Sequence, residues 1–316
     1  MTIKKILVLE GGYNEEHEVS IKSSLEIKKI LKKNNYKFKT LKVNPKNFEK
    51  KISNYKEYIC FNALHGPFGE DGEIQRILKK NKIKFTHSGV ISSTNCFNKA
   101  ITKKIISKHK ILTPKYKIFK RNELNLKNLI EIRKNFKKFV IKPTRSGSSY
   151  GVQIIKNEKD FKNLIKNIDN FKKEISFHND ILIEEYIVGK ELTVSTIEFK
   201  KNKIEALSVT EIKFKNSFFD YKAKYSKGYA KHILPAKISK INYSKCLNLA
   251  LKCHKVLGCK SIARTDFIFN PKNKKIYFLE INTQPGLTAL SLLPEQAKYR
   301  NISFEKIVLG LLKNAN

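Results

Sequence analysis

The chain has 316 residues, 41% of them hydrophobic, and a formal net charge of +37. A chain of this length and composition buries a full core in two or three globular units, which excludes a disordered protein. No segment approaches the roughly 18 apolar residues that a membrane helix needs, so we expect no membrane partner.

The positive charge would suit a nucleic-acid-binding protein. The lysines are, however, spread along the whole chain among asparagines and isoleucines, so a solvated lysine coat is favoured and no nucleic-acid partner is expected. The five cysteines form no Cys-x-x-Cys pair, and the apolar run at residues 6–9 is too short for a signal peptide. We therefore expect reduced thiols and a cytoplasmic protein.

The N-terminal segment has the pattern of an open parallel α/β unit. Residues 3–9 read as a buried strand that runs into Gly11-Gly12, and helical spacing follows to about residue 35. Strands are predicted at residues 38–43 and 58–64, and the second leads into a glycine-rich segment at residues 65–72. In open parallel sheets, ligands bind at such strand ends, although glycines also serve simple tight turns.

The middle of the chain combines a lysine-rich helix with short strands. Lys99 and Lys103 lie on the helix, and strands at residues 139–142 and 152–155 are joined by a loop rich in glycine and serine. This loop can present backbone N–H groups to a phosphate, with Lys142 or Arg145 supplying charge. No Walker motif occurs, so any ATP would be bound outside the P-loop class. A strand at residues 181–187 ends in acids, which suits either a nucleotide contact or an ordinary turn.

The C-terminal part begins with an aromatic-rich segment at residues 218–225, a candidate lid, and continues with an amphipathic helix that Gly258 ends. Two strands with polar faces follow. Arg264 and Asp266 alternate on one strand, and Glu280 and Asn282 alternate on the next, so each pair shares a face. Where the strands pair, these oxygens suit Mg²⁺ beside a phosphate; a hairpin with its polar face in water is the alternative.

Taken in order, these motifs resemble the D-alanine–D-alanine ligases of the ATP-grasp superfamily over nearly the whole chain. The matching segments are Gly11-Gly12, Glu16-His17-Glu18-Val19-Ser20, His65-Gly66, Gly69-Glu70-Asp71-Gly72, Lys99, Lys103, Lys142-Pro143, Gly147-Ser148-Ser149, residues 184–191, Asp220-Tyr221-Lys222-Ala223-Lys224-Tyr225, Arg264-Thr265-Asp266, Glu280-Ile281-Asn282-Thr283, Pro285-Gly286-Leu287-Thr288 and Ser291-Leu292. The resemblance implies that ATP phosphorylates one D-alanine to an acyl phosphate, which the amine of a second D-alanine attacks.

The resemblance also implies a nucleotide and metal site. Two Mg²⁺ or Mn²⁺ ions would be held by Asp266, Glu280 and Asn282. The expected ATP contacts are Lys99, Lys142, Ser148, Ser149, Glu184, Glu185, Ile187 and Glu191.

Two D-alanine sites are implied as well. Glu18 would bind the ammonium of the first D-alanine and hydrogen-bond with Ser148 and Tyr225. Arg264 and the backbone N–H of Gly286 would stabilise the tetrahedral oxyanion. The remaining substrate contacts implied are Ser291, Leu292 and Lys224 at the second carboxylate and His65 near the acceptor amine.

The expected fold is therefore α/β, with α+β character in the C-terminal half. An N-terminal open parallel sheet at residues 1–92 precedes a two-part ATP-grasp fold at residues 93–184 and 185–316, and a homodimer is expected from the resemblance. Tyr225 favours a dipeptide product, and a ligase for D-serine or D-lactate is the alternative. Gln284 departs from the family, which commonly has a small residue before Pro285.

Overall fold

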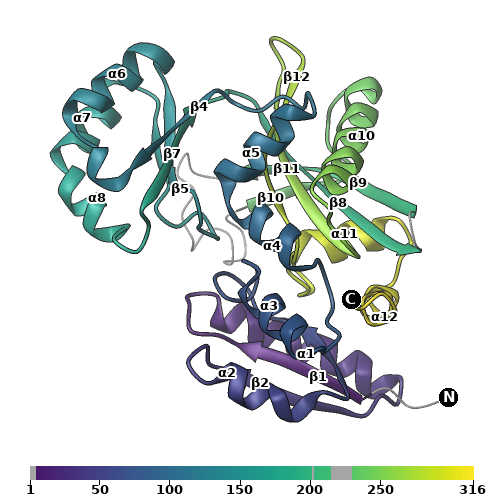
Figure 1. Cartoon of the computed structure of the whole chain (residues 1–316). Helices are drawn as coiled ribbons and strands as arrows, with labels where there is room; N and C mark the ends of the chain where they lie inside the picture. Colours follow the sequence, from purple (N-terminus) through teal and green to yellow (C-terminus); the bar gives the residue numbers. More distant parts are fainter. Residues whose placement is uncertain (1–4, 201–202, 215–229) are drawn as a thin grey trace.

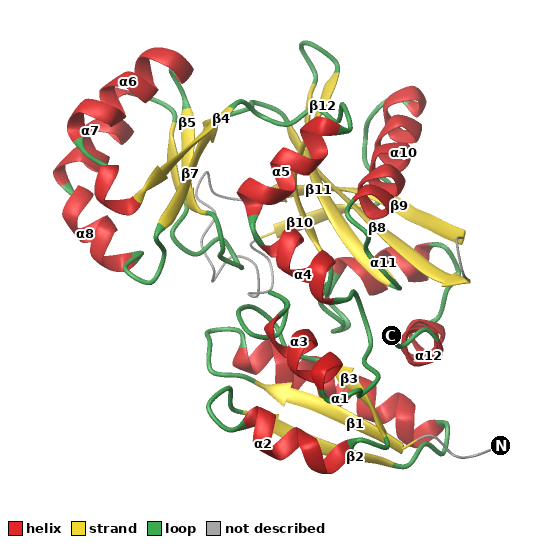
Figure 2. Ribbon diagram, viewed as in Figure 1, coloured by secondary structure: helices red, strands yellow, loops and turns green. Residues whose placement is uncertain are grey.

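The computed structural model describes residues 5–200, 203–214 and 230–316. The chain builds three sheets, each with its own helices, and Figures 1 and 2 show them as three lobes. The predicted residues Asp220, Lys224 and Tyr225 lie outside the described residues.

The first lobe contains a parallel sheet of order β2-β1-β3, which confirms the predicted open parallel α/β unit. The order along the chain is β1 (Lys5–Gly11), α1 (His17–Lys33), β2 (Phe38–Val43), α2 (Phe48–Ile52), a 3-10 turn (Ser53–Tyr55), β3 (Tyr58–Asn62) and α3 (Glu73–Lys80). Residues 6–9 of β1 are wholly buried because both faces of the sheet are covered. The even-numbered residues pack into one hydrophobic cluster and the odd-numbered ones into another.

The second lobe is an antiparallel sheet of order β4-β7-β5-β6, with three helices on its outer face (Figure 1). Its elements are β4 (Tyr116–Lys120), a 3-10 turn (Arg121–Glu123), α6 (Leu126–Phe136), β5 (Phe139–Pro143), β6 (Gln153–Ile155), α7 (Glu158–Lys166), α8 (Ile168–Glu174) and β7 (Asp180–Glu185). The predicted pair of short strands is confirmed, because β5 and β6 pair antiparallel on either side of the glycine- and serine-rich loop.

The third lobe is a larger antiparallel sheet of order β10-β9-β8-β11-β12. Its elements are β8 (Lys190–Lys200), β9 (Lys203–Phe214), β10 (Ala230–Ile233), α10 (Lys240–Val256), β11 (Ile262–Asn270), β12 (Lys275–Asn282), α11 (Leu292–Tyr299) and α12 (Phe304–Lys313). Helix α10 packs its apolar face on the sheet and ends at Val256, and Gly258, two residues later, has a φ of +64°, which confirms the predicted left-handed residue.

Two segments cross between the lobes. Helices α4 (Val90–Phe97) and α5 (Lys99–Lys108) follow the first lobe but pack on the third, where Cys96 and Ile106 share a core with Phe267 and Phe278. Helix α12 contacts α1 of the first lobe as well as β8 and α11 of the third, and its apolar residues share a core with Ile6 and Val8 of β1. The second lobe is thereby inserted between parts of one larger body.

In the described part of the chain, none of the helices has both the length and the apolar character to span a membrane.

Candidate active site

The polar strands β11 and β12 pair antiparallel, as predicted, with Asp266 opposite Glu280 and Arg264 opposite Asn282. Asp266 is 8% exposed. Its carboxylate accepts hydrogen bonds from Arg264 Nε at 3.0 Å and Nη2 at 2.7 Å, and from Thr193 Oγ1 on β8 at 2.6 Å. These side chains are thus largely covered, unlike the polar face of a solvated hairpin.

Lys99 joins this strand pair to the loop between β5 and β6. Its Nζ lies 3.5 Å from Glu280 Oε2 and donates to the backbone oxygen of Ser146 at 2.6 Å. The Lys99 residue is 8% exposed, so little water screens the charge of its ammonium group. Lys99 therefore brings a cation to the edge of the carboxylate pair, where phosphates would need one.

The oxygen donors of this face fit a magnesium ion that is completed by other ligands. Asp266 and Glu280 are direct cross-strand neighbours, and the half-buried Asn282 adds an amide oxygen, which also accepts the backbone N–H of Gln284 at 2.7 Å. The described residues contain no cluster of three or more His, Cys, Asp or Glu side chains that could hold a metal ion unaided. Magnesium commonly takes one or two carboxylates and fills its remaining positions with water and substrate phosphates.

The loop between β5 and β6 has an unusual backbone. Ser148 and Ser149 have φ angles of +47° and +61°, in the left-handed region that non-glycine residues rarely occupy. Ser148 Oγ donates to Glu16 Oε1 at 2.6 Å, and Tyr150 donates its hydroxyl proton to the backbone oxygen of Glu174 at 2.6 Å. Strained backbone of this kind is often found at ligand-binding sites, and the role of this loop at a phosphate stays a prediction.

The acid that meets this loop is Glu16, not the predicted Glu18. Glu16 immediately precedes α1 and is 8% exposed, whereas Glu18 lies two residues further on, in the first turn of α1, and is exposed to solvent. The prediction that Glu18 contacts Ser148 is therefore wrong. In parallel α/β sheets, ligands bind where a strand ends and the next helix begins, so the residue just before that helix lies at the binding edge. The predicted start of α1 would therefore have pointed to Glu16.

Two glycines make room for the carboxylate of Glu16. A Cβ atom added at Gly66 would lie 2.7 Å from Glu16 Oε2, and one added at Gly147 would lie 3.1 Å from it. Gly66 also has a φ of +71°. The carboxylate thus sits between two close backbone segments, one from the first lobe and one from the second.

Glu184 is the centre of a buried ion triad. Its carboxylate oxygens lie 2.7 Å from Lys103 Nζ and 2.5 Å from Lys142 Nζ, and its side chain is 3% exposed. Burial by itself would raise the pKa of Glu184, but the two lysines outweigh burial and hold its pKa below the ordinary value. Glu184 is thus an ionised acceptor.

Lys103, which was not among the predicted site residues, completes the triad. Its Nζ lies 2.5 Å from Thr113 Oγ1 and 5.6 Å from the ring centroid of Tyr116. Burial lowers the pKa of Lys103 to about 8, against the opposing effect of Glu184. Lys103 and Lys142 come from α5 and β5, so residues from two lobes converge on Glu184.

The other predicted nucleotide contacts follow Glu184 along the chain. Glu185 ends β7, Ile187 lies in the connection to β8, and Glu191 lies on β8. All three are half-buried, and their contact with a nucleotide stays a prediction.

His65 lies inside the first lobe with both ring nitrogens engaged. Nε2 lies 3.1 Å from Ser23 Oγ and Nδ1 lies 3.2 Å from Glu70 Oε1. Burial would lower the pKa of His65, but the adjacent carboxylates of Glu70 and Glu16 raise it above the ordinary value. A role of His65 beside an acceptor amine stays a prediction.

The loop after β12 brings Gly286 against Ser291. A Cβ atom at Gly286 would lie 2.7 Å from Ser291 Oγ, so a larger residue there would displace the Ser291 hydroxyl. Ser291 Oγ also accepts the backbone N–H of Thr288 at 3.2 Å, and Leu292 begins α11. The predicted residues Gly286 and Ser291 thus lie close together, and a role of this loop at a substrate stays a prediction.

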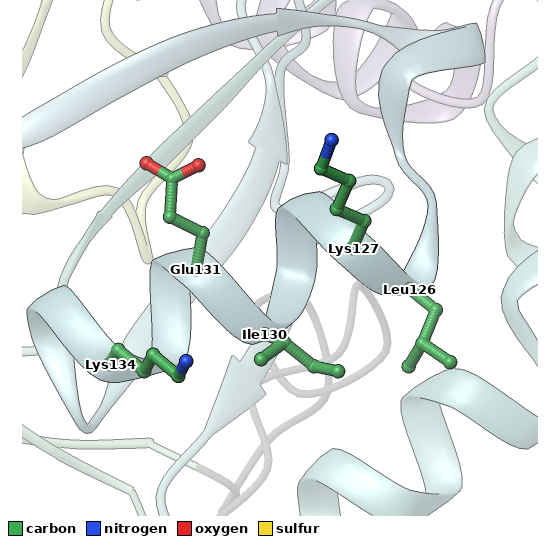
Figure 3. Close-up of a pocket in the computed structure, with 5 residues that line it drawn as sticks. All are labelled: Leu126, Lys127, Ile130, Glu131 and Lys134. Atoms are coloured by element: carbon green, nitrogen blue, oxygen red, sulfur yellow. The ribbon is translucent and has the colours of Figure 1, made fainter.

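A shallow hollow on the outer helix α6 lies apart from all of these groups. Figure 3 shows the side chains that line it, Leu126, Lys127, Ile130, Glu131 and Lys134. No predicted site residue takes part, so the hollow carries none of the chemistry described above.

Comparison with known proteins finds one family throughout. The family model described as D-ala D-ala ligase C-terminus matches residues 105–313. The D-alanine--D-alanine ligase of Pelagibacter ubique (strain HTCC1062) is 45% identical, with 99% of this chain and 98% of that protein covered. The enzyme of the same name from Wolbachia pipientis wMel is 40% identical, with 99% and 95% covered.

Solved structures agree over the whole fold. The D-alanine--D-alanine ligase from Bacillus anthracis complexed with ATP superposes with a TM-score of 0.79 at 27% identity, covering 98% of this chain and 97% of that one. The VanG D-Ala:D-Ser ligase from Enterococcus faecalis gives a TM-score of 0.79 at 26% identity, with 98% of each chain covered.

Proposed function

The chain belongs to the D-alanine–D-alanine ligase family, and from this premise we infer that it joins two D-alanine molecules, using ATP, to form D-alanyl-D-alanine, ADP and phosphate. The observation that carries this inference is the facing pair Asp266 and Glu280, with Lys99 linking Glu280 to the loop of Ser148. A carboxylate is a poor acyl donor, and its phosphorylation needs a site that gathers cations and oxygen ligands around phosphates.

We propose that Asp266, Glu280 and Asn282 hold two Mg²⁺ or Mn²⁺ ions. Bound there, the ions would neutralise charge on the ATP phosphates. Lys99 and Lys142 are proposed to contact the phosphates directly, with Ser148 and Ser149 closing over them. The neighbouring Arg264 holds Asp266 through two hydrogen bonds, which fixes the orientation of that carboxylate.

The nucleotide base is proposed to lie beside Glu184, Glu185 and Ile187, with Glu191 at the ribose. The ionised state of Glu184 supports this proposal, because a carboxylate can accept a hydrogen bond from an adenine amino group. Glu184 and Glu185 end the last strand of the second lobe and Glu191 lies at the start of the third, so ATP would lie between the two antiparallel sheets.

The first D-alanine is proposed to bind with its ammonium group at Glu16, which takes the role that the sequence analysis gave to Glu18. Glu16 already joins the first lobe to Ser148 of the second. An ammonium ion there would find a nearly dry carboxylate.

The second D-alanine is proposed to bind by its carboxylate to Ser291, Leu292 and Lys224, with His65 near its amine. When that amine attacks the acyl phosphate, Arg264 and the backbone N–H of Gly286 would donate to the oxyanion. Tyr225 is proposed to help close the site, as in the sequence analysis.

We further propose the division at residues 1–92, 93–184 and 185–316, a homodimer, and a cytoplasmic role in supplying precursors for the bacterial cell wall. Because α4 and α5 pack on the third lobe, a division by packing would begin the central unit near β4 instead of at residue 93.

Phosphate release tests the proposal. Purified protein with Mg²⁺ and ATP should release phosphate only when D-alanine is present, and one dipeptide should form for each phosphate. D-serine and D-lactate, each offered together with D-alanine, test the identity of the acceptor. If either is joined in preference to the second D-alanine, it is the acceptor in place of D-alanine. Absence of D-alanine-dependent phosphate would refute the function.

A further inference from the structure

Gln284 lies between the proposed metal ligands and the loop of Gly286, and no step above uses it. The residue is 2% exposed although its side chain is polar. We propose that Gln284 is a positioning residue that sets the substrate-binding loops of the first lobe against the loop carrying Gly286. This inference rests on the proposed function and assigns a further residue to the same site.

The side-chain amide of Gln284 bridges two lobes. Its Oε1 accepts a hydrogen bond from Asn62 Nδ2 at 2.9 Å, and its Nε2 donates to the backbone oxygen of Leu64 at 2.5 Å. Both partners lie at the carboxyl end of β3, where the first lobe presents its binding loops. Gln284 therefore holds the first lobe by a donor and an acceptor at once, which fixes orientation as well as distance.

Asn62 is saturated in the same network. Its Nδ2 also donates to the backbone oxygen of Gly69 at 3.0 Å, and its Oδ1 accepts the backbone N–H of Leu64 at 3.1 Å. The residue is 1% exposed, so water cannot replace a lost partner. Loss of the amide of Gln284 would leave one donor of Asn62 without its acceptor.

From Leu64 the network continues to the proposed ammonium site. The backbone oxygen of the next residue, His65, accepts a hydrogen bond from Asn14 Nδ2 at 2.9 Å. Asn14 Oδ1 in turn accepts the backbone N–H of Glu16 at 2.9 Å. The position of Glu16 is thus connected to Gln284 through short, buried or half-buried hydrogen bonds.

The backbone of Gln284 contacts the end of β12, the strand that carries two of the proposed metal ligands. Its N–H donates to Asn282 Oδ1 at 2.7 Å, and Gly286 follows two residues later. A single residue therefore links a proposed metal ligand, a proposed oxyanion donor and the loops that place both D-alanine molecules. Misplacement of reacting groups by about 1 Å can cost about 100-fold in rate.

The test replaces Gln284 with methionine, which keeps the volume and removes the amide. We expect kcat/KM for D-alanine to fall by about 10-fold to 100-fold, because the two lobes no longer meet in one fixed register. The KM for ATP should stay within about twofold, since the nucleotide contacts lie on the other two lobes. Wild-type and variant enzymes are compared by phosphate release with each substrate varied in turn.

The matched control is Gln296→Met. Gln296 is also wholly buried, and its side chain accepts from the backbone N–H of Ser195 and donates to the backbone oxygen of Thr193 and to Thr210 Oγ1, all within the third lobe. This variant should lower Tm, with the KM for D-alanine and the KM for ATP changing in equal proportion or not at all. An equal pattern in both variants would overturn the positioning role.

A second variant tests the same contact from the first lobe. Asn62→Ser removes the donor to Gln284, and in combination with Gln284→Met the losses in kcat/KM should be clearly less than multiplicative. Independent, multiplicative losses would overturn the proposal, as would a normal kcat/KM for D-alanine in a folded Gln284→Met enzyme. If the wild-type protein itself lacks D-alanine-dependent turnover, the proposed function fails instead.

Discussion

Two carboxylates of the site, Glu184 and Glu16, are held in contrasting ways. Glu184 lies between two buried lysines, in a cluster complete in the protein alone. Glu16 meets Ser148 across a boundary between lobes, on a loop whose residues have left-handed backbone angles. The proposed nucleotide side of the site is therefore formed by ion pairs within the protein, while the proposed substrate side depends on a contact between a loop of one lobe and a residue of another.

The largest expected effect tests the proposed nucleotide side. Glu184→Gln removes the carboxylate that two buried lysines share and should reduce the free energy of unfolding by about 3–5 kcal/mol, because two buried cations lose a partner at once. Urea unfolding measures this loss. The control Lys117→Met removes the exposed ion pair with Glu131 and should cost less than about 1 kcal/mol. Similar losses in both variants would show that the triad is not special.

The next effect concerns the transition state. Arg264→Met removes a proposed oxyanion donor and the anchor of Asp266, and kcat should fall by about 10²-fold to 10³-fold. Steady-state phosphate release at saturating ATP and D-alanine measures this change. A variant with normal kcat would remove Arg264 from the chemistry and leave it as a structural partner of Asp266.

The proposed substrate side is tested by a neighbouring pair of acids. Glu16→Gln should raise the KM for D-alanine about 10-fold to 100-fold, because a charge-assisted contact to the ammonium group is lost. Glu18→Gln, two residues away and exposed, should leave the KM for D-alanine unchanged. If Glu18→Gln gives the larger increase, the assignment taken from the structure is reversed.

The smallest effect isolates the loop. Ser148→Ala keeps the loop and the charge of Glu16 but removes the hydroxyl donor, so kcat/KM for D-alanine should fall only about 2-fold to 10-fold. The measurement is the same phosphate assay at low D-alanine concentration. A loss as large as that of Glu16→Gln would mean that Ser148 contributes more than the positioning of Glu16.

Sequence reasoning succeeded where a short pattern determines the geometry. Alternation within each strand was enough to predict that Arg264 shares a face with Asp266 and Glu280 with Asn282, and the structure adds the register that places Asp266 opposite Glu280. It failed to identify Glu16. Glu16 lies just before α1 and Glu18 lies in its first turn, so the two side chains point in different directions, and the sequence does not show which of them is buried.

The long-range contacts were also out of reach. Lys103 lies on α5, which packs on the third lobe, whereas Glu184 lies on β7 of the second lobe. Their ion pair therefore depends on how the two lobes pack together. Gln284 was noted as a departure from the family, but its partners Asn62 and Leu64 lie in another lobe. Tertiary packing decides such contacts, and local periodicity carries no signal of them.

The chain enters the second lobe through β4 and leaves it through β7. These two strands pair with each other, with Tyr116 opposite Glu184. The chain just before β4 is fixed to β12, where Phe278 donates its backbone N–H to the oxygen of Leu112 at 2.8 Å. The lobe is thus covalently joined to the larger body by two neighbouring segments of the chain. Amide protons of β5 and β6 should therefore exchange with solvent in a kinetic phase of their own, faster than those of β8 and β11, which lie inside the larger body.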